Sequence, residues 1–126
     1  PYKAKSFEDY SSLLIDLDLI RVEDNGKSYA FNIEGKRKVP LEIFLYAVLY
    51  EKGRDKSVSY DTLQEIGLMF CMADAEVIDM AQNIGESYSA YVQYSDNAGI
   101  RQLLFKEGSS LTSMDVLEKY YKNAAV

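Results

Sequence analysis

Histidine is absent from this chain of 126 residues. Its absence removes the Ser-His and Cys-His nucleophile pairs and the commonest transition-metal ligand. It also removes the one side chain whose unperturbed pKa lies near neutrality. Catalysis would therefore depend on carboxylates, lysine or tyrosine. We expect a protein that is not an enzyme and has no cofactor.

Cysteine is scarce, and long apolar runs are missing. Cys71 is the single cysteine and lies in the run IGLMFCMA, so we expect a buried structural thiol in a reducing compartment. No apolar run approaches the roughly 20 residues that span a bilayer, and the start shows no signal-peptide pattern. We therefore expect a cytoplasmic protein. Because the chain begins at Pro1 rather than Met, we also expect a domain excised from a longer protein.

Negative charge is concentrated in the second half of the chain. Residues 1–56 carry 10 Lys+Arg and 10 Asp+Glu, whereas residues 57–126 carry 4 and 10, which accounts for the net charge of −6. Basic residues that could meet a phosphate backbone therefore lie mostly in the first half. The length predicts a single domain, residues 1–126, which is large enough to bury a core without disulfides.

Residues 1–39 are expected to form a helix followed by a β-hairpin. Apolar residues recur at helical spacing between residues 7 and 17. Asn25-Gly26 is the two-residue loop that favours a type I′ hairpin, since both positions need positive φ. That loop pairs Val22 with Tyr29 and Ile20 with Phe31. The four apolar side chains then share one face, as a half-buried hairpin requires.

Three helices are expected next. The segment LEIFLYAVLY, preceded by Pro40, is apolar on nearly every side and predicts a helix at the centre of the domain. Ser59 predicts the start of a second helix, which Gly67 would end. Asp74 and Gly85 would bound a third in the same way.

The rest of the chain predicts a hairpin and a last helix. Strict alternation from Tyr88 to Ser95 predicts a strand, and residues 100–105 predict another. Asp96 to Gly99 fits a type I turn at the hairpin tip better than a phosphate loop, which would need more glycines. The last helix would begin at Thr112 and Asp115. Its Leu117, Tyr120 and Tyr121 are expected to pack on the body.

This order of elements predicts an α+β fold, winged-helix-like, with about five helices and two antiparallel β-hairpins. Residues 1–39 would form the helix plus β-hairpin, and residues 40–126 the winged-helix-like unit with the C-terminal helix. In such a unit the helix at 74–85 would face the DNA major groove. It carries Asp74, Glu76 and Asp79 but no Lys or Arg. Groove-reading helices need donors and cations, so we expect a protein partner, or the N-terminal region of the same chain.

Two alternative functions stay open. A DNA-binding module would use the basic connector, and its candidate nucleic-acid contacts are Arg21, Lys27, Lys36, Arg37, Lys38 and Arg101. A carboxylate-metal nuclease would use Glu34-Gly35-Lys36, which matches the E-x-K element of a large nuclease class, with Asp16 or Asp18. The hairpin register places Glu34 opposite Leu17 and away from both. Glu76 and Asp79 could hold a hard cation, although such a pair is more often a solvated face.

Three segments together resemble a known family. They are LIDLDLIRVEDNGKSYAFN leading into VPLEIFLYAVL, then GLMFCMADAEVIDMAQNIGE, then YSDNAGIRQLLFK followed by VLEKYY. Their order is similar to the C-terminal portion of the bacterial domain of unknown function 4007. The resemblance implies a cytoplasmic bacterial protein encoded beside DNA-modification and phage-defence genes, including phosphorothioation clusters. It supplies no catalytic, cofactor or metal residues. We therefore expect a non-catalytic interaction module, with no membrane contact and no small-molecule ligand.

Overall fold

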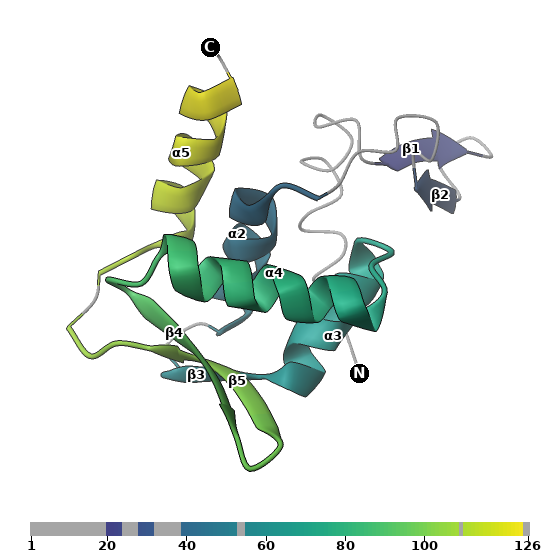
Figure 1. Cartoon of the computed structure of the whole chain (residues 1–126). Coiled ribbons are helices and arrows are strands. Elements are labelled where there is room, and N and C mark those ends of the chain that lie inside the picture. The colour runs from purple at the N-terminus through teal and green to yellow at the C-terminus, as the bar shows by residue number, and fades with distance from the viewer. Residues whose placement is uncertain (1–19, 24–27, 32–38, 53–54, 109, 125–126) are drawn as a thin grey trace.

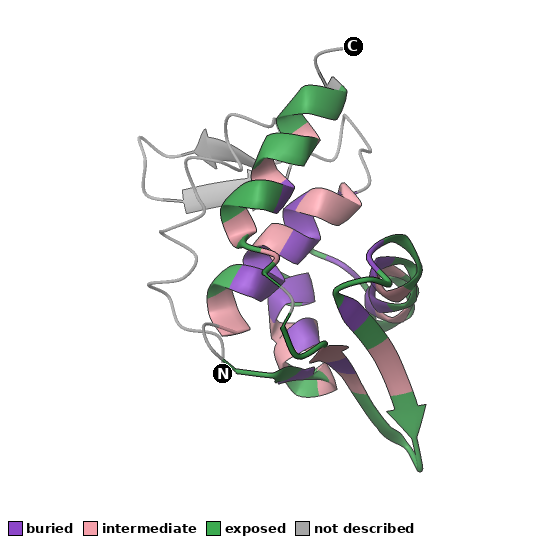
Figure 2. Ribbon diagram, turned by 90° about the vertical axis from the view of Figure 1, so that its left-hand side faces the viewer, coloured by how far each residue is buried: buried purple, intermediate pink, exposed green. Residues whose placement is uncertain are grey.

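The described structure centres on α2 (Leu41–Lys52), a helix that is apolar on nearly all sides. The structure, a computed structural model, describes residues 20–23, 28–31, 39–52, 55–108 and 110–124. Half of α2 is buried: Ile43, Phe44, Leu45, Ala47, Val48 and Leu49. Figure 2 shows the buried residues, drawn in purple, concentrated where the helices meet. The prediction that LEIFLYAVLY forms the buried centre is confirmed.

A three-stranded antiparallel sheet lies against the helices. It is built from β3 (Ser57–Ser59), β4 (Val92–Asn97) and β5 (Ile100–Phe105), in the order β3-β5-β4. The helices α3 (Tyr60–Met69) and α4 (Asp74–Ser87) connect β3 to β4. Figure 1 shows the β4–β5 hairpin extending away from the helices.

The last helix, α5 (Ser113–Ala124), lies beside α2 (Figure 1). Its start has the predicted cap. The Thr112 N–H donates to Asp115 Oδ2, and the Asp115 N–H donates to Thr112 Oγ1, each at 3.1 Å. Val116 is buried against the core, whereas Tyr121 is 47% exposed. The prediction that Tyr121 packs on the body is therefore wrong.

The first hairpin is separate from this sheet. Strands β1 (Ile20–Glu23) and β2 (Ser28–Phe31) pair as predicted, with Ile20 opposite Phe31 and Val22 opposite Tyr29. This confirms the register that Asn25-Gly26 predicted. The loop itself and the expected helix at 7–17 lie outside the described residues.

The strand after α4 begins later than predicted. A turn at residues 88–91 precedes β4, so the prediction of a strand from Tyr88 is wrong. The Tyr88 N–H donates to the Ile84 carbonyl at 2.9 Å, and the Val92 N–H donates to the Tyr88 carbonyl at 3.0 Å. The apolar–polar alternation at Tyr88 and Ala90 thus belongs to a helix end and a turn. The backbone hydrogen bonds of that helix end and turn compete with strand pairing.

Two glycines predicted to end helices lie inside them instead. Gly67 is a buried residue of α3, where a Cβ would overlap Val77 Cγ2 of α4. Gly85 lies in α4, where a Cβ would come within 3.0 Å of the Tyr94 backbone nitrogen in β4. Both positions need glycine because a neighbouring element approaches closely.

Cys71 is exposed, so the prediction of a buried thiol is wrong. It lies in the turn between α3 and α4 with a φ of 57°. Phe70 and Met72 on either side are buried. A turn that buries both neighbours directs the residue between them to solvent, whatever the hydrophobicity of the run.

The prediction of an α+β fold is confirmed. The described residues form four helices, a three-stranded antiparallel sheet and the β1–β2 hairpin. Within the described ranges, no helix is both long enough and apolar enough to cross a bilayer.

Candidate interaction site

Helix α4 carries the candidate site, and its N-terminus is fixed by several contacts. The Ala73 N–H donates to Glu76 Oε1 at 3.1 Å, as the N3 residue of a capping box does. Asp74 Oδ1 accepts a hydrogen bond from Gln64 Nε2 at 3.0 Å. Acidic side chains here are also favoured by the helix macrodipole. Asp74 was predicted as the cap but is the first helical residue.

The inner face of α4 anchors the helix to the domain. Val77, Ala81 and Ile84 recur at helical spacing and are buried. The absence of a Cβ at Gly67 lets α3 approach Val77, and Gly85 lets β4 approach the helix from the other side. These contacts pack the inner face of α4 against its neighbours and leave its outer face exposed.

The outer face of α4 is acidic. Its exposed residues include Glu76, Asp79, Gln82, Asn83 and Glu86. Three of them carry a carboxylate, and the helix has no Lys or Arg. This face therefore presents negative potential without an internal counter-charge.

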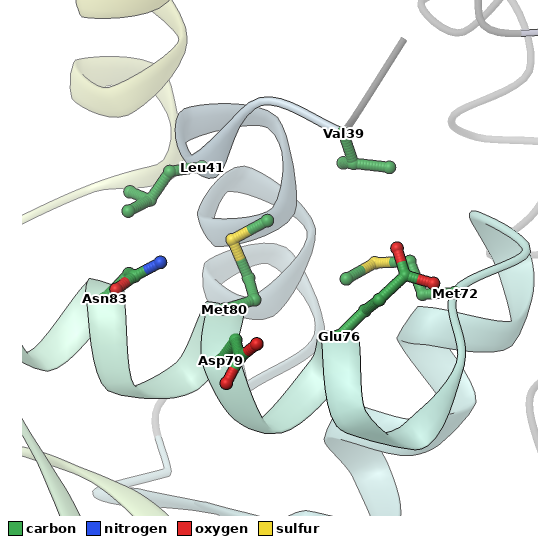
Figure 3. Close-up of a pocket in the computed structure, with 7 residues that line it drawn as sticks. All are labelled: Val39, Leu41, Met72, Glu76, Asp79, Met80 and Asn83. Carbon is green, nitrogen blue, oxygen red and sulfur yellow. The ribbon is translucent and has the colours of Figure 1, made fainter. Parts of the chain in front are cut away.

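A groove of about 330 Å³ lies between this face and the start of α2. We call it the α4 groove; it is lined by Val39, Leu41, Met72, Glu76, Asp79, Met80 and Asn83. In Figure 3 the Met80 side chain points toward α2, with Asp79 and Asn83 beside it on the helix and Leu41 opposite. The groove thus combines an apolar floor with carboxylates at its edge.

A tyrosine at the far end of α4 is the most strongly perturbed titratable group described. Tyr88 is 5% exposed, and its hydroxyl donates to Glu42 Oε2 at 3.5 Å. Burial, the Glu42 charge and this hydrogen bond together raise the pKa of Tyr88 to about 12. The hydroxyl stays protonated near neutrality, so this contact serves packing between α2 and α4.

Among the described residues, no group of three or more His, Cys, Asp or Glu side chains is arranged to hold a metal ion. Glu76 and Asp79 share a face of α4 and both line the α4 groove. Asp16, Asp18 and Glu34, the residues of the nuclease hypothesis, lie outside the described ranges. Chemically, the described part of the site can bind a cation or a basic side chain.

Two of the six candidate nucleic-acid contacts, Arg21 and Arg101, lie in described strands. Arg21 lies in β1, and Arg101 lies in β5, so the two belong to separate sheets. Figure 1 places those two hairpins at opposite ends of the molecule. Lys27, Lys36, Arg37 and Lys38 lie outside the described residues.

Arg101 is also partly engaged within the protein. Its Nε lies 3.6 Å from Asp96 Oδ2 across the hairpin. Its guanidinium lies 5.6 Å from the centroid of the Tyr60 ring. These contacts reduce what Arg101 could offer to a phosphate.

The α4 groove was missed by sequence reasoning. The acidic face could be predicted from the helical spacing of Glu76 and Asp79. The opposing wall could not, because Val39 and Leu41 are far from α4 in sequence. Only tertiary packing brings the two together.

Comparison with solved structures supports the fold. An SspB crystal structure matches with a TM-score of 0.59 and 23% identity, covering 96% of this chain and 38% of that one. A magnesium-ion-bound SspB structure matches with a TM-score of 0.56 and 24% identity, covering 86% and 34%. This chain thus spans little more than a third of those chains. At such identities the likeness shows the fold alone.

Family comparison identifies the chain more directly. No curated protein matches it. The family described as "Protein of unknown function (DUF4007)" matches residues 2–121, which is nearly the whole sequence. The chain belongs to the DUF4007 family.

Proposed function

We propose that this chain is a non-catalytic, winged-helix-like interaction module of a bacterial DNA-modification or phage-defence protein. It binds a protein partner, or another part of its own chain, through the outer face of α4. The observation that carries the proposal is the acidic character of α4, which takes the place of the helix that a DNA-binding winged helix sets in the major groove.

The topology supports the winged-helix interpretation. The order α2, β3, α3, α4, β4, β5 and the sheet order β3-β5-β4 are those of a winged helix. In this arrangement α3 and α4 correspond to a helix-turn-helix pair, and α4 to its recognition helix. The β4–β5 hairpin corresponds to the wing.

The charge of α4 favours polypeptide over DNA. Three carboxylates, Glu76, Asp79 and Glu86, project from its exposed face, with no Lys or Arg in the helix. Reading guanine requires side-chain donors, and holding a duplex requires cations against phosphates. Like charges set against each other at an interface cost on the order of several kcal/mol. The same face attracts a basic protein surface.

Family membership supports the DNA-modification setting. The chain belongs to the DUF4007 family. The resemblance of its motifs to that family implies a place beside phosphorothioation and phage-defence genes. The role within such a system is the proposed protein contact.

A site-specific photocrosslinker can test the proposal in the native protein. Benzoylphenylalanine at Gln82, which is exposed on α4, is compared with the same residue at Asn123, exposed on α5. Both proteins are irradiated in cells that carry the native gene neighbourhood. We expect adducts from position 82 that are sensitive to protease and resistant to nuclease, and fewer from position 123. Adducts to DNA, or equal adducts from both positions, would contradict the proposal.

A carboxylate-metal nuclease is the second function, and one observation bears on it. One of the SspB structures that resemble this chain contains magnesium. The carboxylates that the sequence offers for such a site, Asp16, Asp18 and Glu34, lie outside the described residues. This alternative therefore stays a prediction.

A further inference from the structure

The floor of the α4 groove is apolar and adaptable. Leu41 and Met80 are half-buried, and Val39 and Met72 are buried beneath them. Methionine is unbranched and flexible, so it adjusts to the shape of what it contacts. A floor of this kind suits the alkyl stem of a long side chain.

The edge of the groove is anionic. Glu76 and Asp79 are three residues apart, which places them side by side on one face of a helix. Glu76 Oε1 accepts the Ala73 N–H, which leaves the other carboxylate oxygen for a further donor. Within the described part of the chain, the carboxylate of Asp79 makes no hydrogen bond or ion pair. The Asn83 amide stands at the same edge and adds a polar contact.

The size of the groove limits its occupant. Pockets for drug-sized ligands run from roughly 300 to 1,000 Å³, and this one is about 330 Å³. It therefore suits one or two side chains of a partner better than a large ligand. An apolar stem with a cationic end matches both the floor and the edge.

We propose that the α4 groove binds an arginine side chain carried by a basic segment of a protein partner. This inference rests on the proposed function, because it names the chemistry that the α4 face recognises. The guanidinium bonds Asp79 and the remaining Glu76 oxygen, and the stem packs on Met80 and Leu41. Arginine fits better than lysine, because its planar fork can meet two carboxylates and is more weakly hydrated.

A peptide pair gives the first test. The probe is a fluorescein-labelled helical peptide with three arginines among alanine and leucine. Its partner has citrulline at the same three positions, which keeps the side-chain shape and removes the charge. We expect the arginine peptide to bind the protein at least about threefold more tightly, in line with one exposed charge-assisted contact. Equal binding of both peptides overturns the proposal.

Matched variants of the protein give the second test. Asp79→Asn and Glu86→Gln each remove one exposed carboxylate from α4, but only Asp79 lines the α4 groove. Asp79→Asn should weaken the arginine peptide about threefold and leave the citrulline peptide unchanged. Glu86→Gln removes a carboxylate outside the groove, so it should weaken the arginine peptide clearly less than Asp79→Asn does. Met80→Ala should weaken both peptides, with thermal melting as the check on folding. Equal effects of Asp79→Asn and Glu86→Gln would show only a general acidic attraction, which overturns the proposal.

The chain itself could also supply the cation, since Lys36, Arg37 and Lys38 directly precede Val39 in the sequence. If replacing these three residues by alanine strengthens peptide binding, the occupant is intramolecular and a partner arginine is ruled out.

Crosslinking from Gln82 distinguishes failure of the arginine proposal from failure of the proposed function. If position 82 crosslinks to polypeptide but Asp79→Asn does not change peptide binding, the proposed function is retained and the arginine site in the α4 groove is contradicted. Adducts to DNA remove the proposed function, whatever the peptide binds.

Discussion

At the scale of single residues, Tyr88 couples the packing of α4 to pH. Its ring is buried, its hydroxyl contacts Glu42, and Lys119 Nζ lies 4.7 Å from the ring centroid. Burial and the neighbouring carboxylate raise its pKa from 10.0 to about 12. An unfolded tyrosine loses its proton near pH 10, whereas folded Tyr88 keeps it. The contribution of this group to stability is therefore present below pH 10 and is lost as pH rises toward 12.

The phenylalanine variant isolates this contribution. Tyr88→Phe has no proton to lose, so its free energy of unfolding should fall less steeply than that of the wild type between pH 10 and 12. The other ten of the 11 tyrosines titrate in both proteins and cancel in the difference. Urea denaturation at pH 9, 10 and 11 measures it. Parallel pH profiles would show that the folded and unfolded pKa values of Tyr88 are the same.

Residue-level prediction from sequence succeeded where one side chain has a local partner. Ser59 was predicted as a cap, and its Oγ accepts the Thr62 N–H at 3.4 Å. It failed where burial depends on the path of the chain. Cys71 was expected in the core because its neighbours are apolar, yet the turn exposes it. Hydrophobicity of a run does not say which of its residues a turn will direct outward.

At the scale of elements, the β4–β5 hairpin shows that the position of a turn can be predicted from sequence more easily than its type. Asp96 to Gly99 was predicted as a hairpin tip, which is confirmed, but as a type I turn, which is wrong. Asn97 pairs with Ile100, so the loop is Ala98-Gly99, with φ of 53° and 80°. Two positive φ values are typical of a type I′ turn, which matches the twist of the strands. Alanine in the left-handed region costs roughly 1–2 kcal/mol.

Relieving that strain should stabilise the hairpin. Asparagine tolerates positive φ, and Asn-Gly is the pair preferred in type I′ turns. Ala98→Asn should therefore raise the free energy of unfolding by roughly 0.5–1 kcal/mol, with little change in the urea m-value. Ala98→Val, a β-branched residue at the same exposed position, should lower it. If both variants destabilise equally, the turn does not hold the left-handed conformation in solution.

Element boundaries were harder to predict than element types. The Asn25-Gly26 loop predicted the register of β1 and β2 because a two-residue turn leaves a single pairing. Strand β4 was predicted to begin too early. Over only four residues, the apolar–polar alternation of a strand looks the same as a helix end followed by a turn. Gly85 was taken as a helix stop, although its role is to admit the Tyr94 backbone. Such close approaches between elements leave no local signal.

At the scale of the whole molecule, the sequence predicted the negative charge of the candidate site but not its shape. Helical spacing alone places Glu76 and Asp79 on one face of α4. The hollow beside them exists because α2 begins across from that face, with Val39 and Leu41 as its wall. Predicting the groove would require knowing how α2 and α4 cross. That crossing depends on packing throughout the core.

The winged-helix interpretation itself makes a prediction about charge. If α4 occupies the recognition-helix position, then cations placed on its outer face should meet phosphates as the hairpin and α3 dock on a duplex. The double variant Asp79→Lys with Glu86→Lys changes two exposed carboxylates of α4 into cations. A matched control, Glu107→Lys with Glu118→Lys, makes the same change in net charge at exposed positions outside α4.

We expect the α4 variant to bind a labelled 20-base-pair duplex at least about threefold more tightly than the control at low salt. Each phosphate contact adds roughly 0.9 to the slope of log affinity against log salt, so the α4 variant should also show the steeper slope. The wild type should bind more weakly than either, because its α4 face repels the duplex. Equal binding by the two variants would mean that only net charge matters. In that case α4 does not face a duplex, and the winged-helix comparison would no longer explain why its acidic surface should select a protein.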